Sequence, residues 1–344
     1  AKLVKEWRTT REGRRKANER FSELTDFSQP GFPKGWVTDG EGLQHGWVKD
    51  CAPRVSLSGE TLITEFLPEG YHTHALSSKL PGALRLPAPE RFSLARVSLK
   101  LAGGEWAGRR AIPQNAFLNE GPLFFDPSLP PTWTAIGVTG LTNGVTRVLT
   151  EISTASLNAN FPPRTGVARA GKTVLPSNDE GFDKRSWFSV TGLVAHDGGG
   201  APTDALDVFA SLYEGEPPAT GELAWLRLSD WLAGAVGRWG EGKTTAGDVE
   251  ALNWLLEEKL LPNDLKSVPR AAPWVKRYRE VEAQIDFPRG ANSMDERGVA
   301  PVNYRLNVRG DVRDEGPAIR RDFLEVFRGM HEVGAASGSG RLEL

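Results

Sequence analysis

Short runs in which apolar and polar residues alternate constrain the fold of this chain more than any other feature. In the run VSLKL at 97–101 every second residue is apolar, which places one face of a strand on a core and the other in water. Runs at 61–67, 134–139, 145–152 and 187–194 are rich in β-branched and aromatic residues and are bounded by turn residues. No helical pattern alternates with them, so they predict antiparallel sheets stacked as a sandwich or jelly roll.

Beyond residue 215 the apolar spacing changes to three and four residues, which is the period of a helix. One such stripe runs from Leu228 to Trp239. Thr245 and Asp248 form a capping box for a second helix, which a proline at position 262 ends. Helices are also predicted at 1–24 and 319–327.

These patterns predict an α+β protein in three parts. Residues 1–27 would be a helix at the tail of a preceding domain, 28–215 a lectin-like, concanavalin-like β-sandwich, and 216–344 the helical start of a truncated C-terminal module. Within the sandwich, turn residues crowd 28–60, and 103–131 predicts a long loop of the kind that is usually functional or locally folded.

Composition excludes several classes of protein. The net charge of −2 argues against general nucleic-acid binding. The single cysteine, Cys51, leaves no internal disulfide, four-cysteine zinc site or CxxCH haem attachment within the chain. No apolar run reaches the roughly 18 residues of a transmembrane helix, and the N-terminal stretch lacks the apolar region of a signal peptide.

Three segments, taken in order, resemble a known family. They are VTGLVAHDGGGAPTDALDVFASL at 190–212, NVRGDVRDEGPAIRRDFLEVF at 307–327 and SGSGRLEL at 337–344. Together they are similar to the large planctomycete cytochrome-c-associated proteins, which combine a haem-c domain with modules of unknown function and often an inserted lectin-like jelly roll.

The resemblance implies that this chain is an internal fragment of an exported protein. Such proteins belong to periplasmic or cell-surface systems that handle complex polysaccharides. Because the CxxCH segment is missing, haem c is expected only in other parts of the parent protein, and no cofactor is expected in this chain.

The segment Tyr71-His72-Thr-His74 is the candidate metal site. On a strand, residues i and i+2 share a face, so both imidazoles can reach one ion, and Glu65 or Glu69 completes the set if a hairpin folds back. A catalytic zinc needs three protein ligands. The alternative is that both histidines are hydrogen-bonded strand or loop residues.

Candidate ligand-binding residues lie in the sandwich. His196 and Asp197 precede three glycines, an arrangement that can grip sugar hydroxyls or calcium, or can simply form a turn. Of the 11 tryptophans, Trp47 and Trp133 are the candidates for stacking on a pyranose ring, although burial is the alternative for each. At the Arg-Gly-Asp segment, residues 309–311, we expect a structural pair of Arg309 with Asp311 that braces a turn, with adhesion as the alternative.

No catalytic motif of a hydrolase, zinc protease, P-loop or dinucleotide-binding enzyme occurs. We therefore expect a non-catalytic extracytoplasmic module that binds carbohydrate or packs against partner domains. The alternatives are a fragment of a redox-linked or polysaccharide-degrading enzyme whose active site needs missing segments, and a structural scaffold. The first predicts an accessible aromatic side chain beside polar groups on the sandwich. The enzyme predicts histidine or carboxylate groups that converge between sandwich and helices.

Overall fold

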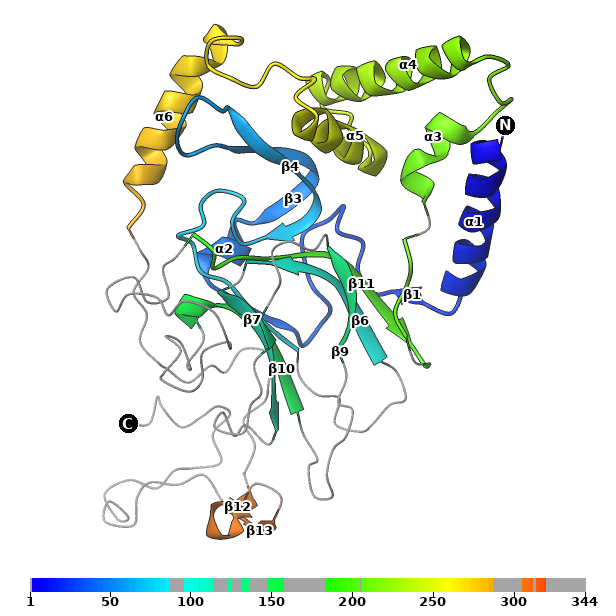
Figure 1. Cartoon of the computed structure of the whole chain (residues 1–344). Coiled ribbons are helices and arrows are strands. Elements are labelled where there is room, and N and C mark those ends of the chain that lie inside the picture. The colour runs from blue at the N-terminus through cyan, green and yellow to red at the C-terminus, as the bar shows by residue number, and fades with distance from the viewer. Residues whose placement is uncertain are drawn as a thin grey trace.

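The computed structural model shows an α+β fold in which two antiparallel sheets pack face to face and helices lie at their margins (Figure 1). The predicted α+β class and the antiparallel arrangement of the sheets are confirmed. The structure describes residues 2–86, 96–104, 106–113, 123–124, 131–136, 148–157, 184–198, 200–204, 206–286, 305–311 and 314–319.

The first sheet, sheet A, has the strand order β3-β4-β11-β6-β9, and β1 pairs with β11 further along the same edge as β4. A bulge interrupts β11 between Val190 and Gly192. The strands of sheet A are β1 (Ser22–Glu23), β3 (Trp47–Val55), β4 (Ile63–His72), β6 (Arg96–Gly103), β9 (Thr132–Ile136) and β11 (Phe188–His196).

The second sheet, sheet B, has the order β2-β5-β10-β7-β8, again antiparallel throughout. Successive strands of the chain therefore change repeatedly from one sheet to the other. The strands of sheet B are β2 (Val37–Asp39), β5 (Ala83–Leu86), β7 (Ala107–Pro113), β8 (Leu123–Phe124) and β10 (Val148–Thr154).

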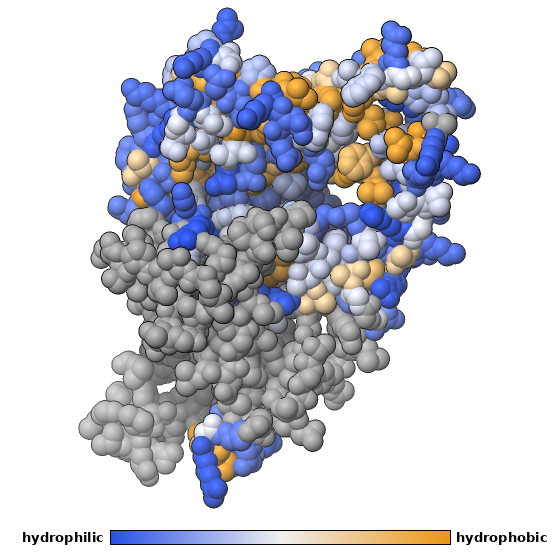
Figure 2. Space-filling model, viewed as in Figure 1, coloured by the Kyte–Doolittle hydropathy of each residue, from blue (hydrophilic) through white to orange (hydrophobic). Residues whose placement is uncertain are grey.

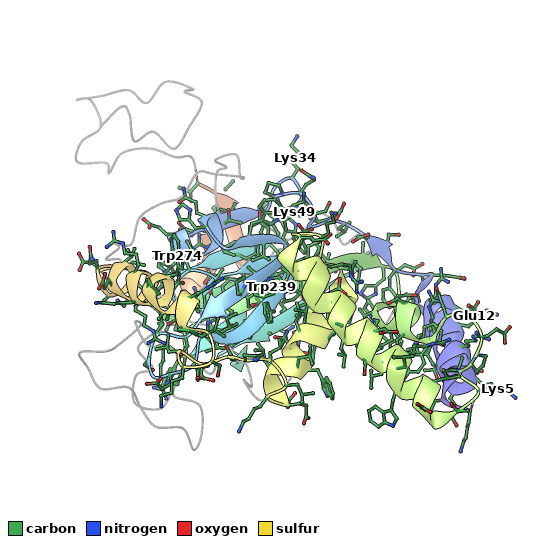
Figure 3. The ribbon with its side chains drawn as sticks, turned by 90° about the horizontal axis from the view of Figure 1, so that it is seen from above. Lys5, Glu12, Lys34, Lys49, Trp239 and Trp274 are labelled. Atoms are coloured by element: carbon green, nitrogen blue, oxygen red, sulfur yellow. The ribbon has the colours of Figure 1, made fainter. Side chains whose placement is uncertain are left out.

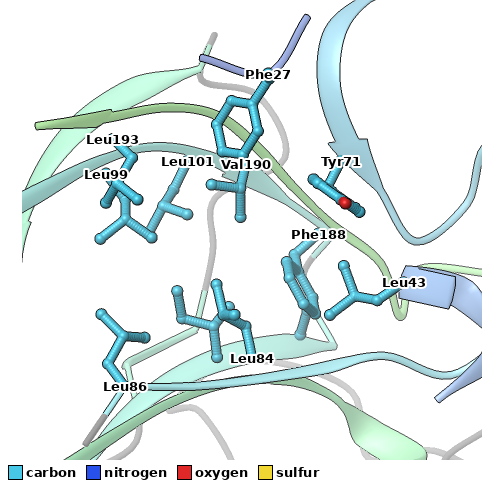
Figure 4. Packing of buried hydrophobic residues seen from close by; sticks show 12 residues of the cluster. Phe27, Leu43, Tyr71, Leu84, Leu86, Leu99, Leu101, Phe188, Val190 and Leu193 are labelled. Atoms are coloured by element: carbon cyan, nitrogen blue, oxygen red, sulfur yellow. The ribbon is translucent and has the colours of Figure 1, made fainter. Parts of the chain in front are cut away.

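The main core lies between the two sheets (Figure 4). Leu99 and Leu101 of β6 point inward, as the alternating pattern predicts, and meet Leu84 of β5 and Ile152 of β10. Each such side chain contributes about 1.5–3 kcal/mol on burial, which explains why this pattern dominates the fold.

Two stretches that predict loops contain strands instead. β3 lies within 28–60, and β7 and β8 lie within 103–131. β3 is the edge strand of sheet A and carries exposed Lys49, Asp50 and Pro53, residues that protect an edge but hide the strand pattern. In β7, Arg110 is buried because it pairs with buried Glu151 of β10.

The outer halves of β3 and β4, residues 51–68, extend beyond the sandwich as a two-stranded arm, which we call the β3–β4 arm. α4 (Gly221–Gly240) and α5 (Ala246–Glu257) lie across it, and Trp239 packs edge-on against Phe66 (Figure 3). The capping box of α5 is confirmed.

The arm's second edge is closed by side-chain amides. Asn253 of α5 accepts from the backbone N–H of Phe66 and donates to its carbonyl, and Asn263 does the same at Ile63. α6 (Ala272–Ala283) covers the arm's tip, where the Arg279 guanidinium donates to four backbone carbonyls, those of Ser56, Ser58, Gly59 and Thr61.

The first helix, α1 (Lys2–Asn18), ends six residues earlier than predicted. Part of its basic surface binds the segment after β11: Arg11 pairs with Asp207 and Glu214, and Arg14 donates to the carbonyl of Asp204. The helix therefore docks on this chain. Two shorter α-helices are α2 (Glu41–Gln44) and α3 (Ala210–Tyr213).

The C-terminal described residues form a hairpin of β12 (Arg305–Asn307) and β13 (Glu315–Ala318). Exposed Arg309 and Gly310 both have positive φ, of 54° and 79°, so the Arg-Gly-Asp segment lies in a tight turn. The pairing of Arg309 with Asp311 stays a prediction. The predicted helix beyond Ile319 lies outside the described residues. Within the described ranges, no helix is long and apolar enough to cross a membrane.

Candidate functional site

Trp133 lies on the outer face of sheet A, on the edge strand β9. Its neighbour across the strands is Lys100 of β6, whose own neighbour on the other side is Gly192 of β11. These three residues form a row across the sheet. We call the row and the neighbouring Asp204 the Trp133 surface. Trp133 is half-buried, and Thr132 beside it in the chain is exposed.

Gly192 makes room for the indole. A Cβ at this position would lie 2.6 Å from the ring carbon Cη2 of Trp133 and 3.2 Å from Cβ of Lys100. The ring therefore reaches across β6 and rests on the backbone of β11. A flat aromatic held in this way can stack on the apolar C–H face of a sugar ring.

A charged pair lies beside the indole. The Lys100 ammonium donates to Oδ1 of Asp204 at 2.7 Å. The Asp204 side chain is 60% exposed and that of Lys100 is 27% exposed, so the carboxylate is the more accessible partner. Along β9 the next outward residue, Ala135, is also exposed. The surface thus offers an aromatic ring with hydrogen-bonding groups at its side.

His196 is the last residue of β11, on the same face of sheet A as Gly192, and Asp197 follows the strand. His196 is buried, and both of its ring nitrogens have partners: Ser98 Oγ at 2.9 Å and the Gly198 carbonyl at 2.7 Å. These bonds favour the turn interpretation. His196, four strand residues from Gly192, lies about 13 Å from it at a rise of 3.3 Å per residue, and exposed Asp197 lies beyond the end of the strand.

Trp47 has a structural environment. It is half-buried, packs against the main core and donates from Nε1 to the carbonyl of Phe27 at 2.8 Å. Its placement favours the burial alternative. The structure therefore brings none of the other predicted ligand residues into contact with Trp133.

The two histidines of the metal hypothesis have different surroundings in the structure. β4 ends at His72, so the shared-face argument does not extend to His74. The ring centroids are 6.1 Å apart. His72 is buried with Nδ1 bonded to Ser189 Oγ and Nε2 bonded to the Pro68 carbonyl, both at 2.8 Å. His72 can therefore bind a metal only by breaking both hydrogen bonds.

His74 lies just after the end of β4, in the loop between β4 and β5. Its side chain is 1% exposed, its ring packs against Trp187 at 4.1 Å, and neither ring nitrogen makes a hydrogen bond. Glu65 Oε1 is 3.6 Å from Nε2, which is an ion-pair distance too long for a hydrogen bond. Glu65 also accepts from Arg54 at 2.6 Å. We call Arg54, Glu65, His72 and His74 the histidine cluster.

Burial and charge set the protonation states of this cluster. Burial, with a smaller contribution from the neighbouring His74, lowers the pKa of His72 to about 3, although the Pro68 carbonyl and Glu65 oppose the shift. Burial also lowers the pKa of His74. Burial alone would raise the pKa of Glu65, but His74 and Arg54 outweigh it and bring that pKa to about 2. At neutral pH the cluster is thus two neutral imidazoles beside an ionised Arg–Glu pair.

Sequence reasoning correctly paired Glu65 with a histidine but missed most partners of Trp133. Lys100 and Asp204 lie 104 residues apart in the chain, and only the docking of the segment after β11 joins them. The one available signal was a glycine inside a strand pattern, since such a residue often marks a bulge or a close approach, as Gly192 does.

Within the described residues, no group of three or more His, Cys, Asp or Glu side chains is arranged to hold a metal ion. Comparisons with protein-family models, with curated proteins and with solved structures find no match to this chain. The planctomycete resemblance therefore stays a prediction.

Proposed function

We propose that this chain is a non-catalytic, extracytoplasmic module whose jelly-roll, concanavalin-like sandwich binds polysaccharide through Trp133. The observation that carries the proposal is the half-buried indole whose Cη2 edge rests against Gly192, with the Lys100–Asp204 pair beside it. An aromatic face next to exposed hydrogen-bonding groups is the combination that recognises a sugar ring.

Two further features support the proposal. The chain changes repeatedly between the two sheets, as jelly rolls do. The family resemblance favours a periplasmic or cell-surface parent protein, in which other domains of the same protein are further partners and haem c is carried elsewhere.

The experiment is a glycan array probed with the whole chain, followed by calorimetry on any glycan that binds. We expect Trp133→Ala to weaken binding at least tenfold, which corresponds to about 1.4 kcal/mol. Trp225→Ala is the matched control, because Trp225 on α4 is 71% exposed and remote from the sandwich face. Circular dichroism checks that both variants fold. An array with no bound glycan, or equal binding by the Trp133 variant, would refute the proposal.

The second candidate is a fragment of a redox-linked or polysaccharide-degrading enzyme. It is favoured by one observation, the Glu65 carboxylate beside a buried imidazole at the junction of arm and helices. A general base must lie within hydrogen-bond reach of its substrate. If this candidate were right, the chain supplied with its missing segments would cleave a glycan, and His74→Gln would abolish the cleavage without affecting glycan binding.

A further inference from the structure

We infer that the Trp133 surface takes neutral pyranose chains and rejects anionic ones, and that Asp204 is the residue that sets this preference. The inference rests on the proposed function and names its ligand class. It follows from which charges beside the indole are already paired and which are accessible.

The cation nearest the indole is already neutralised. Lys100 donates to Asp204 at 2.7 Å, and its side chain is the less exposed of the two. A uronate or a sulfate ester approaching the indole therefore meets the carboxylate more readily than the ammonium. Like charges at close range repel, so an anionic sugar loses free energy where a neutral one does not.

The other cations on this side are hydrogen-bonded within the protein or distant. Arg14 donates to the backbone carbonyl of Asp204 and Arg109 to that of Ala135 on β9, bonds that hold both guanidinium groups but leave them charged. Arg11 pairs with Asp207 and Glu214. The Arg20 guanidinium lies over the ring of Phe21 at 4.8 Å, near the glycine turn at the far end of β11. No cluster of free cations surrounds the indole among the residues that the structure describes.

Asp204 retains acceptor capacity for sugar hydroxyls. Lys100 occupies one site on Oδ1, and an ionised carboxylate has about four lone-pair sites. In the described part of the chain, the remaining oxygen, Oδ2, has no hydrogen-bond partner. Neutral hydroxyls can therefore donate to Asp204 while the ring stacks on Trp133, whereas a sugar carboxylate has only acceptors to offer.

The test compares neutral with anionic oligosaccharides by calorimetry on the whole chain. The probes are hexaoses of β-glucan, β-mannan and xylan, set against oligogalacturonate and oligoalginate of the same length. We expect at least one neutral series to bind and every anionic series to bind at least tenfold more weakly. The affinity for the neutral series should change less than twofold between 50 and 500 mM NaCl, because salt screens interactions between charges and a neutral ligand has none.

Asp204→Asn sharpens the test. It removes the negative charge and leaves Lys100 without an ionic partner, so we expect weaker neutral binding by about threefold and stronger anionic binding by at least fivefold. Asp197→Asn removes an exposed carboxylate just beyond the end of β11, away from the indole, and is the matched control that should change neither.

Preferential binding of an anionic series, or affinity that falls steeply with salt, would overturn the inference while leaving glycan binding intact. Binding of no oligosaccharide of either kind would instead overturn the proposed function itself, and the inference with it.

Discussion

The Trp133 surface and the histidine cluster are opposite solutions to placing polar groups on one scaffold. At Trp133 the polar pair is accessible and the ring lies on a glycine, so an external molecule can reach both. At the histidine cluster the most reactive groups are dry: His74 is 1% exposed, and both nitrogens of His72 are bonded within the protein. Accessibility, more than residue type, therefore separates the surface that we propose binds a ligand from the cluster buried inside the fold.

The same comparison applies to the exposed apolar side chains of the helices. Figure 2 shows hydrophobic residues at the surface in the region of α4. Leu223, Trp225 and Leu226 on α4 and Trp274 on α6 are more accessible than Trp133. None of them has a hydrogen-bonded charged pair among the described residues beside it, as Trp133 has. Exposure therefore has to combine with fixed polar neighbours before it indicates sugar recognition.

Acid should expose the difference between the two regions most strongly. The folded pKa of His72 is about 3 and its unfolded value is 6.5, so the unfolded chain binds more protons between these limits. Stability is therefore lost as pH falls below about 6.5, by roughly 1.4 kcal/mol per pH unit and site. Urea unfolding at pH 7, 6, 5 and 4 measures this slope.

The control for the acid experiment is His72→Gln, which keeps a polar side chain but cannot titrate. Its slope between pH 6.5 and 4 should be shallower than that of the wild type by about one proton. Equal slopes would mean that His72 is not the buried neutral base described above.

A smaller effect is expected at Glu65. Its pKa of about 2 lies below the unfolded value of 4.5, so it contributes stability above pH 4.5 that disappears as pH falls toward 2. Its side chain is 38% exposed, so solvent screening limits the contribution. We expect Glu65→Gln to lower the unfolding free energy at pH 7 by about 1 kcal/mol or less.

Glu280→Gln serves as the reference for that measurement. Glu280 forms only exposed ion pairs on α6, at 3.9 and 4.0 Å, and its substitution should have almost no effect. A Glu65 variant that is as stable as the Glu280 variant would show that the Arg54–Glu65–His74 group does not stabilise the arm.

The smallest effect concerns how the indole is seated. Gly192→Ala places a Cβ 2.6 Å from Trp133 Cη2 and must move the ring without removing it. We expect glycan affinity to fall about threefold, which is roughly 0.6 kcal/mol. Gly237→Ala in α4, where a Cβ meets nothing within 4 Å, should leave affinity unchanged and slightly stabilise the helix.

The sequence predicted those parts of the fold in which one face alone is apolar. β6 is recognisable because Leu99 and Leu101 point inward while Ser98 and Lys100 point outward. β7 was missed because its buried Arg110 depends on Glu151, 41 residues away, and a local pattern cannot show such a partner. The helices α4 and α5 were predicted because stripe and capping box are local signals.

The candidate site follows the same logic. Trp133 was a candidate from its residue type and its position beside a strand. Its orientation depends on the bulge at Gly192, and its charged neighbours depend on the docking of the segment after β11, which are tertiary features. The metal hypothesis assumed a strand that continues through His74. β4 instead ends at His72, whose ring is held by two internal hydrogen bonds.

The measurement closest to the central claim is a titration of the whole chain with a bound glycan, followed through the indole N–H resonances of its 11 tryptophans. Assignment through Trp133→Phe identifies the decisive signal. We predict a saturable shift of the Trp133 resonance, with the Trp187 resonance beside His74 unchanged. A shift at Trp187 with none at Trp133 would place the ligand at the histidine cluster and contradict the account.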